Sequence, residues 1–262
     1  MRILLEGLRL AWGTLTAIPG PPPKNVNAAV AGVAMSIGWL VVLPVTLACA
    51  ALGWGLALLE VPAAAAGLVV VASLAVATRA IHADGLADTA DGLGSGRPRE
   101  AALEIMRRGD VGPMGVLAVV LVYGLQGVLI GDLLIRPGGW VLAGLALAVG
   151  RLALTHACSR AVPAARTDGL GTGVARSVPR WLGALLTVAL FLVGMLVTDG
   201  LAGWLGPGVD RNAWAWGLVA GTFLSGSVLA LAVRKLGGIT GDVLGAMVEL
   251  MALGILLGLA IR

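Results

Sequence analysis

Long apolar runs dominate the chain, and polar residues gather in short stretches between them. A helix needs about 20 mostly apolar residues to cross the hydrocarbon core of a bilayer. Runs of this kind predict seven crossing helices, namely Ala28–Trp54, Val61–Thr78, Pro113–Ile135, Trp140–Ala157, Trp181–Thr198, Ala213–Val233 and Asp242–Ile261. Strands of a transmembrane barrel would be shorter and would alternate at every second residue. The pattern therefore predicts an all-α, polytopic helical bundle that forms one domain over residues 1–262.

The segment before the first long run has a helical period of its own. Arg2, Glu6 and Arg9 recur at helical spacing, and leucines such as Leu4 and Leu8 fall on the other side. A proline-rich stretch at residues 19–23 ends the pattern. We expect an amphipathic helix that lies in the membrane interface.

Composition excludes the other broad classes of protein. Hydrophobic residues make up 58% of the chain and charged residues 12%, compared with about 25% charged residues in ordinary soluble domains. These charges are too few to coat a water-soluble globule. The net charge of +4 is modest and gives no indication of a nucleic-acid partner. The chain is expected to have the lipid bilayer as its surroundings.

Lysine and arginine are distributed unevenly between the two sides that the predicted helices define. Alternate loops and the N-terminal arm contain 15 of the 18 basic residues. Basic residues favour the cytoplasmic side of a membrane. We therefore expect a multi-pass protein of the cytoplasmic membrane, with the N-terminus and the long polar loops in the cytoplasm and the C-terminus outside.

An acidic stretch directly follows the second predicted helix. Asp84, Asp88 and Asp91 are spaced at i, i+4 and i+7, so a helix would place all three carboxylates on one face. Like charges this close repel one another unless a cation lies among them, and Mg²⁺ suits carboxylates combined with substrate phosphates. The same stretch begins with His82, a candidate base or phosphate contact. The alternative interpretation is a solvated acidic loop.

Basic residues accompany the carboxylates. Arg107 and Arg108 lie in the same loop, and Arg166 and Asp168 lie in a glycine-rich loop after the fourth predicted helix. Guanidinium groups bind phosphate oxygens in bidentate fashion, so these residues are candidate substrate contacts. The bias of basic residues toward the cytoplasm explains the arginines equally well.

The last predicted helix opens on a motif that suits an anion. Gly238, Thr240 and Gly241 precede Asp242, and backbone N–H groups at a helix N-terminus favour phosphate. Glu249 follows two turns later, and an ionisable group inside a crossing helix is a candidate site residue. We expect Asp242 and Glu249 to be further metal ligands, although Asp242 would serve equally as a helix cap and a polar partner on a neighbouring helix would also account for Glu249. Residues alone thus indicate a membrane enzyme with a Mg²⁺-dependent site for a diphosphate.

The chain resembles the cobalamin synthase family, the adenosylcobinamide-GDP ribazoletransferases. The resemblance rests on several segments in the family's order, which are Leu15–Pro19, His82–Asp91, Glu104–Arg107, Gly112–Gly115, Ala165–Gly171, Gly237–Asp242 and Glu249-Leu250. One departure comes directly after Glu104–Arg107. The family's pattern has an acidic residue there and a basic residue two positions later, whereas this chain has Arg108 first and Asp110 second.

The resemblance implies that a ribose hydroxyl of α-ribazole, or of its 5′-phosphate, attacks the cobinamide-side phosphorus of adenosylcobinamide-GDP. GMP leaves, and adenosylcobalamin or its 5′-phosphate is formed. The three aspartates would bind Mg²⁺, and one of them would serve as general base. Whether such an enzyme forms a homo-oligomer or associates with other enzymes of cobalamin assembly stays open.

Two other functions remain as alternatives at this point. A CDP-alcohol phosphotransferase of phospholipid synthesis would also use helical carboxylates, Mg²⁺ and release of a nucleoside monophosphate. A secondary transporter would use Glu249 and the charged loops to couple ions, and it would need inverted repeats with broken helices. Release of GMP that requires Mg²⁺ separates an enzyme from a transporter, and the acceptor alcohol separates the two enzymes.

Overall fold

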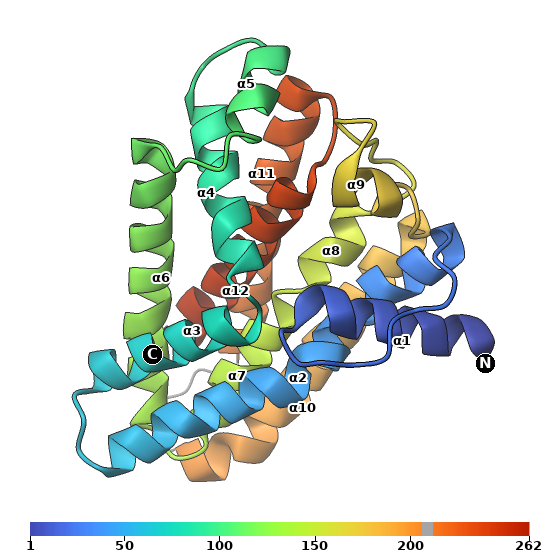
Figure 1. Cartoon of the computed structure of the whole chain (residues 1–262). Helices are drawn as coiled ribbons and strands as arrows, with labels where there is room; N and C mark the ends of the chain where they lie inside the picture. The colour runs from blue at the N-terminus through green and yellow to red at the C-terminus, as the bar shows by residue number, and fades with distance from the viewer. Residues whose placement is uncertain (206–211, 262) are drawn as a thin grey trace.

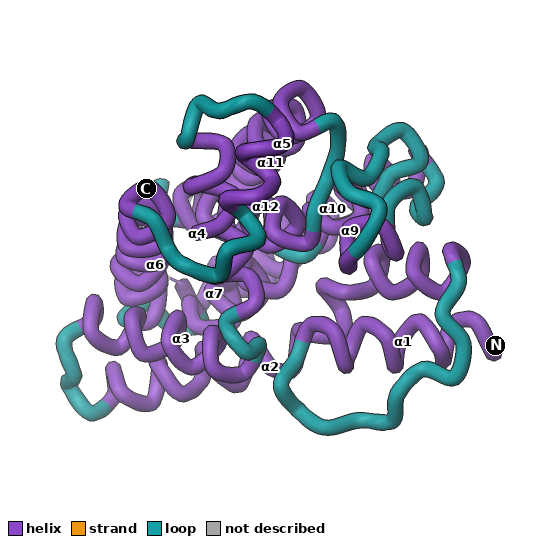
Figure 2. The backbone as a smooth tube through the Cα atoms, turned by 45° about the horizontal axis from the view of Figure 1, so that its top comes forward, coloured by secondary structure: helices purple, strands orange, loops and turns teal. Residues whose placement is uncertain are grey.

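The computed structural model describes residues 1–205 and 212–261, with side chains at 1–200 and 212–261. The described part is helical, and apart from two isolated bridges it contains no strand (Figures 1 and 2). Its helices are α1 (Arg2–Leu15), α2 (Ala28–Leu58), α3 (Ala63–Ala77), α4 (Ile81–Gly94), α5 (Arg99–Ile105), α6 (Pro113–Leu134), α7 (Gly139–Val149), α8 (Leu152–Ala157), α9 (Gly169–Val174), α10 (Arg180–Leu205), α11 (Ala213–Leu236) and α12 (Gly241–Leu259).

Six of the seven predicted crossing segments are long apolar helices. They are α2, α6, the joined pair α7–α8, α10, α11 and α12. The protein is therefore a multi-pass membrane protein with an all-helical fold, as the apolar runs predicted.

The second predicted crossing segment differs from the others. Its helix α3 has 15 residues, too few to pass as a crossing helix by itself, and it is followed by α4 at an angle of 95°. The chain turns at Arg79 and Ala80, whose φ angles of 55° and 54° are left-handed. The bend directs α4 back into the bundle instead of out into a solvated loop.

Helix α12 lies at the centre of the bundle, between α4 and α11 (Figure 1). Glycines allow these backbones to approach closely. A Cβ atom at Gly85 of α4 would lie 2.7 Å from the carbonyl oxygen of Asp242, and one at Gly245 of α12 would lie 3.1 Å from the Cα atom of His82. On the other side, Gly254 of α12 packs directly on Gly221 of α11. The acidic helix is thereby held against the first turns of α12.

Helix α1 forms as predicted, but part of its polar face points inward. Glu6 is buried, and its carboxylate accepts hydrogen bonds from the backbone N–H of Lys24 at 2.6 Å and from Arg9 at 3.1 Å. Leu4 and Leu8 remain exposed. This exposed apolar face is the one that an interfacial helix would present to lipid.

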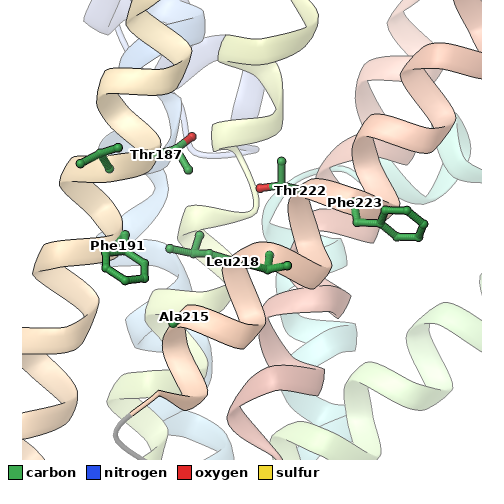
Figure 3. A pocket seen from close by; sticks show the side chains of 8 residues that line it. Thr187, Phe191, Ala215, Leu218, Thr222 and Phe223 are labelled. Carbon is green, nitrogen blue, oxygen red and sulfur yellow. The ribbon is translucent and has the colours of Figure 1, made fainter.

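A groove between α10 and α11 is lined only by apolar side chains and threonines (Figure 3). Its volume is about 470 Å³, and Phe191, Leu218 and Thr222 line it. Both helices are long enough to cross a membrane, and Phe223 beside the groove is largely exposed. Because no charged group faces this groove, it offers nothing to a diphosphate.

Candidate active site

Three carboxylates gather where α4 meets the first turn of α12. Asp84 and Asp88 lie one turn apart on α4, and Asp242 is the second residue of α12. The backbones of the two helices touch at Gly85 and Asp242, which brings the side chains into one cluster. Asp84 is exposed, whereas Asp88 is buried. We call Asp84, Asp88 and Asp242 the acidic cluster.

The acidic cluster needs positive charge. Burial, and after it the nearby carboxylates of Asp84, Asp242 and Asp91, raise the pKa of Asp88 to about 6, while Arg166 acts in the opposite direction. Arg166 is the nearest cation, with its Nη1 atom 3.7 Å from Oδ2 of Asp242. One guanidinium does not balance three carboxylates, so the cluster suits an additional cation.

Asp91, the third predicted ligand on α4, has other partners. Its Oδ2 atom accepts the backbone N–H of Gly112 at 2.7 Å, and its Oδ1 atom accepts that of Gly115 at 2.9 Å. Both donors lie at the start of α6, where backbone N–H groups lack partners within the helix. Asp91 therefore joins α4 to the N-terminus of α6, and its role as a ligand stays a prediction.

The Asp91→Ala variant separates these two roles. Two hydrogen bonds to a charged group would be lost, so we expect the free energy of unfolding to fall by about 1.5–3 kcal/mol for each bond. A role confined to α6 predicts that the folded fraction keeps most of its turnover, measured as product formed per folded molecule. Abolished turnover in a variant with an unchanged melting temperature would instead make Asp91 a ligand.

A second polar group lies deeper in the bundle. It is formed by residues that are each at most 5% exposed, Glu249, His82 and Arg151. Glu249 accepts a hydrogen bond from Gln126 of α6 at 3.0 Å, and its Oε1 atom lies 3.5 Å from Nδ1 of His82. An Nη2 atom of Arg151 lies 3.2 Å from the same His82 nitrogen. We call Glu249, His82, Arg151 and Gln126 the buried network.

The buried network fixes the start of α4. Nδ1 of His82 lies between a donor, the guanidinium of Arg151, and an acceptor, the carboxylate of Glu249. His82 thus has a neighbour on α12 and another between α7 and α8. That His82 and Glu249 act on substrate or metal stays a prediction. The side-chain contacts found for both residues are with other members of the buried network.

The 15 basic residues expected in the cytoplasm include Arg151, assigned to the loop after the fourth predicted helix, and this assignment is wrong. Arg151 lies at the junction of α7 and α8, is 1% exposed, and donates to the carbonyl oxygen of Leu147 at 2.5 Å. A signal was present in the sequence. Arg151 and Glu249 are opposite charges inside two apolar runs, and ionisable groups within membranes tend to pair.

The loop before α9 brings its arginine to the acidic cluster. Besides facing Asp242, Arg166 donates from Nη2 to the carbonyl oxygen of Leu103 on α5 at 2.8 Å. Arg107 and Asp168 pair with each other, with Nη2 of Arg107 at 2.8 and 2.9 Å from the two carboxylate oxygens. Arg108 is exposed beside them. The predicted phosphate contacts thus lie along one edge of the site.

Sequence reasoning gave no individual role to Arg99. Its Nε atom donates to the carbonyl oxygen of Leu236 at 2.7 Å, and its Nη2 atom donates to that of Ala165 at 2.9 Å. It thereby ties α5 to the end of α11 and to the residue before Arg166. Its position in a basic loop gave no indication of these partners.

The motif that opens α12 has a structural use. Thr240 caps the helix by accepting the N–H of Val243 at 3.2 Å, and it donates to Asp242 at 3.1 Å. Gly238 packs against the carbonyl oxygen of Pro163, where no Cβ atom would fit. Gly241 lies in the first turn of α12, near Leu170. These residues hold the loop of Arg166 beside the acidic cluster, and direct contact with phosphate stays a prediction.

Two cavities adjoin the acidic cluster. A groove of about 700 Å³ between α4 and α6 has Asp84 and Arg79 on one wall and valines such as Val116 and Val120 on the other. A smaller, polar pocket of about 280 Å³ between α5 and the Arg166 loop is lined by Arg107 and Arg166 among others. The cluster is therefore accessible from the larger groove at Asp84, whereas the smaller pocket adjoins it only through Arg166.

The acidic cluster fits a Mg²⁺ ion that is completed by its substrate. Across the described residues, no three His, Cys, Asp or Glu side chains already lie at the spacing of metal ligands. Mg²⁺, however, is usually held by one or two carboxylates together with substrate phosphates and water. Asp84 and Asp88, with Asp242 opposite, supply such a donor set.

Comparison with known proteins gives a consistent family. The family profile described as cobalamin-5-phosphate synthase matches residues 7–260. The chain is 40% identical to an adenosylcobinamide-GDP ribazoletransferase of a Nocardioides species, covering 98% of this chain and 99% of the relative. It is 36% identical to a protein of that name from Frankia casuarinae, covering 98% and 95% of the two chains. No solved structure matches.

Proposed function

We propose that this chain, which belongs to the cobalamin-5-phosphate synthase family, joins adenosylcobinamide-GDP to α-ribazole or its 5′-phosphate and releases GMP. The relatives are named adenosylcobinamide-GDP ribazoletransferases, which supports transferase activity in cobalamin biosynthesis over the phospholipid and transporter alternatives. The observation that carries the proposal is the acidic cluster with Arg166 beside it.

The acidic cluster would hold Mg²⁺ through Asp84 and Asp88 of α4 and Asp242 of α12. Bound there, the ion would neutralise diphosphate oxygens and stabilise the charge that develops as the phosphoryl group is transferred. Arg166 is placed to bind a phosphate oxygen next to Asp242, and Arg107, which Arg108 follows in the chain, lines the same polar pocket as Arg166. The diphosphate would thus lie between α4 and the Arg166 loop.

The reaction needs a base as well as a phosphate site. The acceptor hydroxyl loses its proton as its oxygen bonds to the cobinamide-side phosphorus, and the bond from that phosphorus to the oxygen of GMP breaks. Burial and neighbouring carboxylates raise the pKa of Asp88 to about 6, closer to neutrality than an ordinary aspartate, which suits a proton acceptor near pH 7. A bound cation would lower that pKa, and it would do so most for the carboxylates that hold it. The carboxylate of the cluster that lies farthest from the ion would therefore serve as the base.

The proposal includes the membrane and the orientation. The basic loops that carry Arg107, Arg166 and Arg176 would face the cytoplasm of a cell with the chain in its cytoplasmic membrane. Both substrates are polar, so a site at the cytoplasmic end of the bundle would be open to them.

Labelling of an introduced cysteine tests the orientation. If the loop before α6 faces the cytoplasm, a cysteine at exposed Asp110 reacts with an impermeant thiol reagent only when the cytoplasmic side is accessible. Native Cys49 and Cys158 are both buried, so they should add little background labelling.

Product analysis tests the proposed activity. The full chain, purified in detergent, is incubated with adenosylcobinamide-GDP and either α-ribazole or its 5′-phosphate, and products are separated by liquid chromatography with mass detection. We expect a cobalamin product and GMP in equal amounts. CDP-diacylglycerol with an alcohol acceptor serves as the matched control. Release of CMP from that control, with no cobalamin product, would contradict the proposal.

A further inference from the structure

A groove that shares no lining residue with the acidic cluster combines an apolar floor with a polar end. It runs between α1, α2 and the start of α10, and its volume is about 500 Å³. Apolar side chains cover most of its length, and they include Leu4, Ile37, Trp39, Leu182 and Leu186. Helices α2 and α10 are both long enough to cross a membrane, so this floor lies along membrane-crossing helices.

The polar end of the groove has donors without acceptors. Ser177 lines the groove and is 8% exposed, and its buried Oγ atom has no hydrogen-bond partner. Arg160 lines the groove beside it, is exposed, and takes part in none of the ion pairs found among the described residues. A buried hydroxyl without a partner is costly, so a ligand atom that accepts its proton is expected there.

Local backbone structure keeps the two donors together. The N–H of Arg160 donates to the carbonyl oxygen of Val178 at 2.8 Å, and the N–H of Val178 donates to that of Cys158 at 3.0 Å. The isolated bridge between Ser159 and Val178 thus holds the segment after α8 against the segment before α10. Ser177 is fixed against α2 as well, since its carbonyl oxygen packs directly on Gly32.

We propose that this groove binds one phospholipid with an acidic headgroup. Its phosphate accepts hydrogen bonds from the guanidinium of Arg160 and the hydroxyl of Ser177, and one acyl chain lies along the apolar floor. The guanidinium of Arg160 favours an acidic headgroup over a zwitterionic one, because no acidic side chain is among the residues that line the groove to balance its charge. The groove of Figure 3, which has no charged side chain, gives no such selection.

Lipid retention measures the proposed site directly. The delipidated full chain is mixed with equal amounts of phosphatidylglycerol and phosphatidylcholine, and native mass spectrometry counts the lipids that each chain retains. We expect preferential retention of one phosphatidylglycerol. Arg160→Gln should lower its affinity about tenfold, the scale of one charge-assisted hydrogen bond. Ser177→Ala should lower it severalfold.

Two further variants make the result decisive. Ala29→Phe places a ring in the groove at an exposed position and leaves every charge in place, so it should abolish retention. Arg180→Gln removes an exposed arginine of the same segment that does not line the groove, and it should retain the lipid. Equal losses in Arg180→Gln and Arg160→Gln, equal retention of both lipids, or undiminished binding by Ala29→Phe would each overturn the proposal. Melting temperatures without lipid verify that each variant is folded.

Discussion

Replacing Asp88 by asparagine is expected to lower turnover by about 10²–10³-fold while the helices stay in place. The substitution keeps the size of the side chain and removes its charge from the acidic cluster. A preorganised electrostatic group of a phosphoryl-transfer site contributes on this scale. Asp84→Asn and Asp242→Asn should have effects of the same kind, because both carboxylates are close enough to act on the charge of Asp88.

The measurement is GMP release under saturating substrates and Mg²⁺, with folded protein quantified by size-exclusion chromatography. Asp110→Asn is the matched control, since Asp110 is an exposed acid in the loop before α6 and lies outside the acidic cluster. We expect the control to retain nearly full turnover. Wild-type turnover in Asp88→Asn would show that this carboxylate has no part in the reaction.

Replacing Arg151 by methionine is expected to be the most destabilising change in the buried network. Methionine fills a similar volume, but it leaves the carboxylate of Glu249 inside the bundle with His82 and Gln126 as its polar neighbours. Arg151 is the positive charge that offsets this carboxylate across His82, and leaving a buried charge uncompensated costs about 3–5 kcal/mol. The loss should also loosen the start of α4, where His82 contacts Arg151.

A double variant distinguishes the loss of a charge partner from the loss of packing. Glu249→Gln removes the carboxylate, so Arg151→Met combined with Glu249→Gln should be more stable than Arg151→Met by itself. Reversible unfolding in mixed detergent micelles gives the free energies. A double variant that is no more stable than the single one would contradict the charge pairing.

The positions of the crossing helices could be predicted because a bilayer requires long apolar segments. The same rule failed at α3, where an apolar run of fewer residues continues into the acidic helix at a bend of 95°. Nothing in the sequence distinguishes a bend at Arg79 and Ala80 from an exit into a loop, since both residues are ordinary at such an exit. The depth of α4 within the bundle was therefore not predictable.

The acidic cluster was predictable only in part. Spacing predicted that Asp84, Asp88 and Asp91 share a face of a helix, but not that the N-terminus of α6 would bind both oxygens of Asp91. Contacts between distant segments depend on where a glycine lets two backbones approach, as Gly85 does at the backbone of Asp242. A single sequence does not show which segments pair in this way. Asp242 was nevertheless identified as a candidate, because it is an acid in the motif that opens the last helix.

Dependence of GMP release on Mg²⁺ tests the central claim most directly. The full chain is given adenosylcobinamide-GDP and α-ribazole at a series of free Mg²⁺ concentrations, with a chelator at the lower end. If the carboxylates of α4 and α12 bind the ion that serves the transfer, release requires both acceptor and Mg²⁺ and saturates with each. Full-rate release in the chelator, or release without the acceptor, would contradict the account.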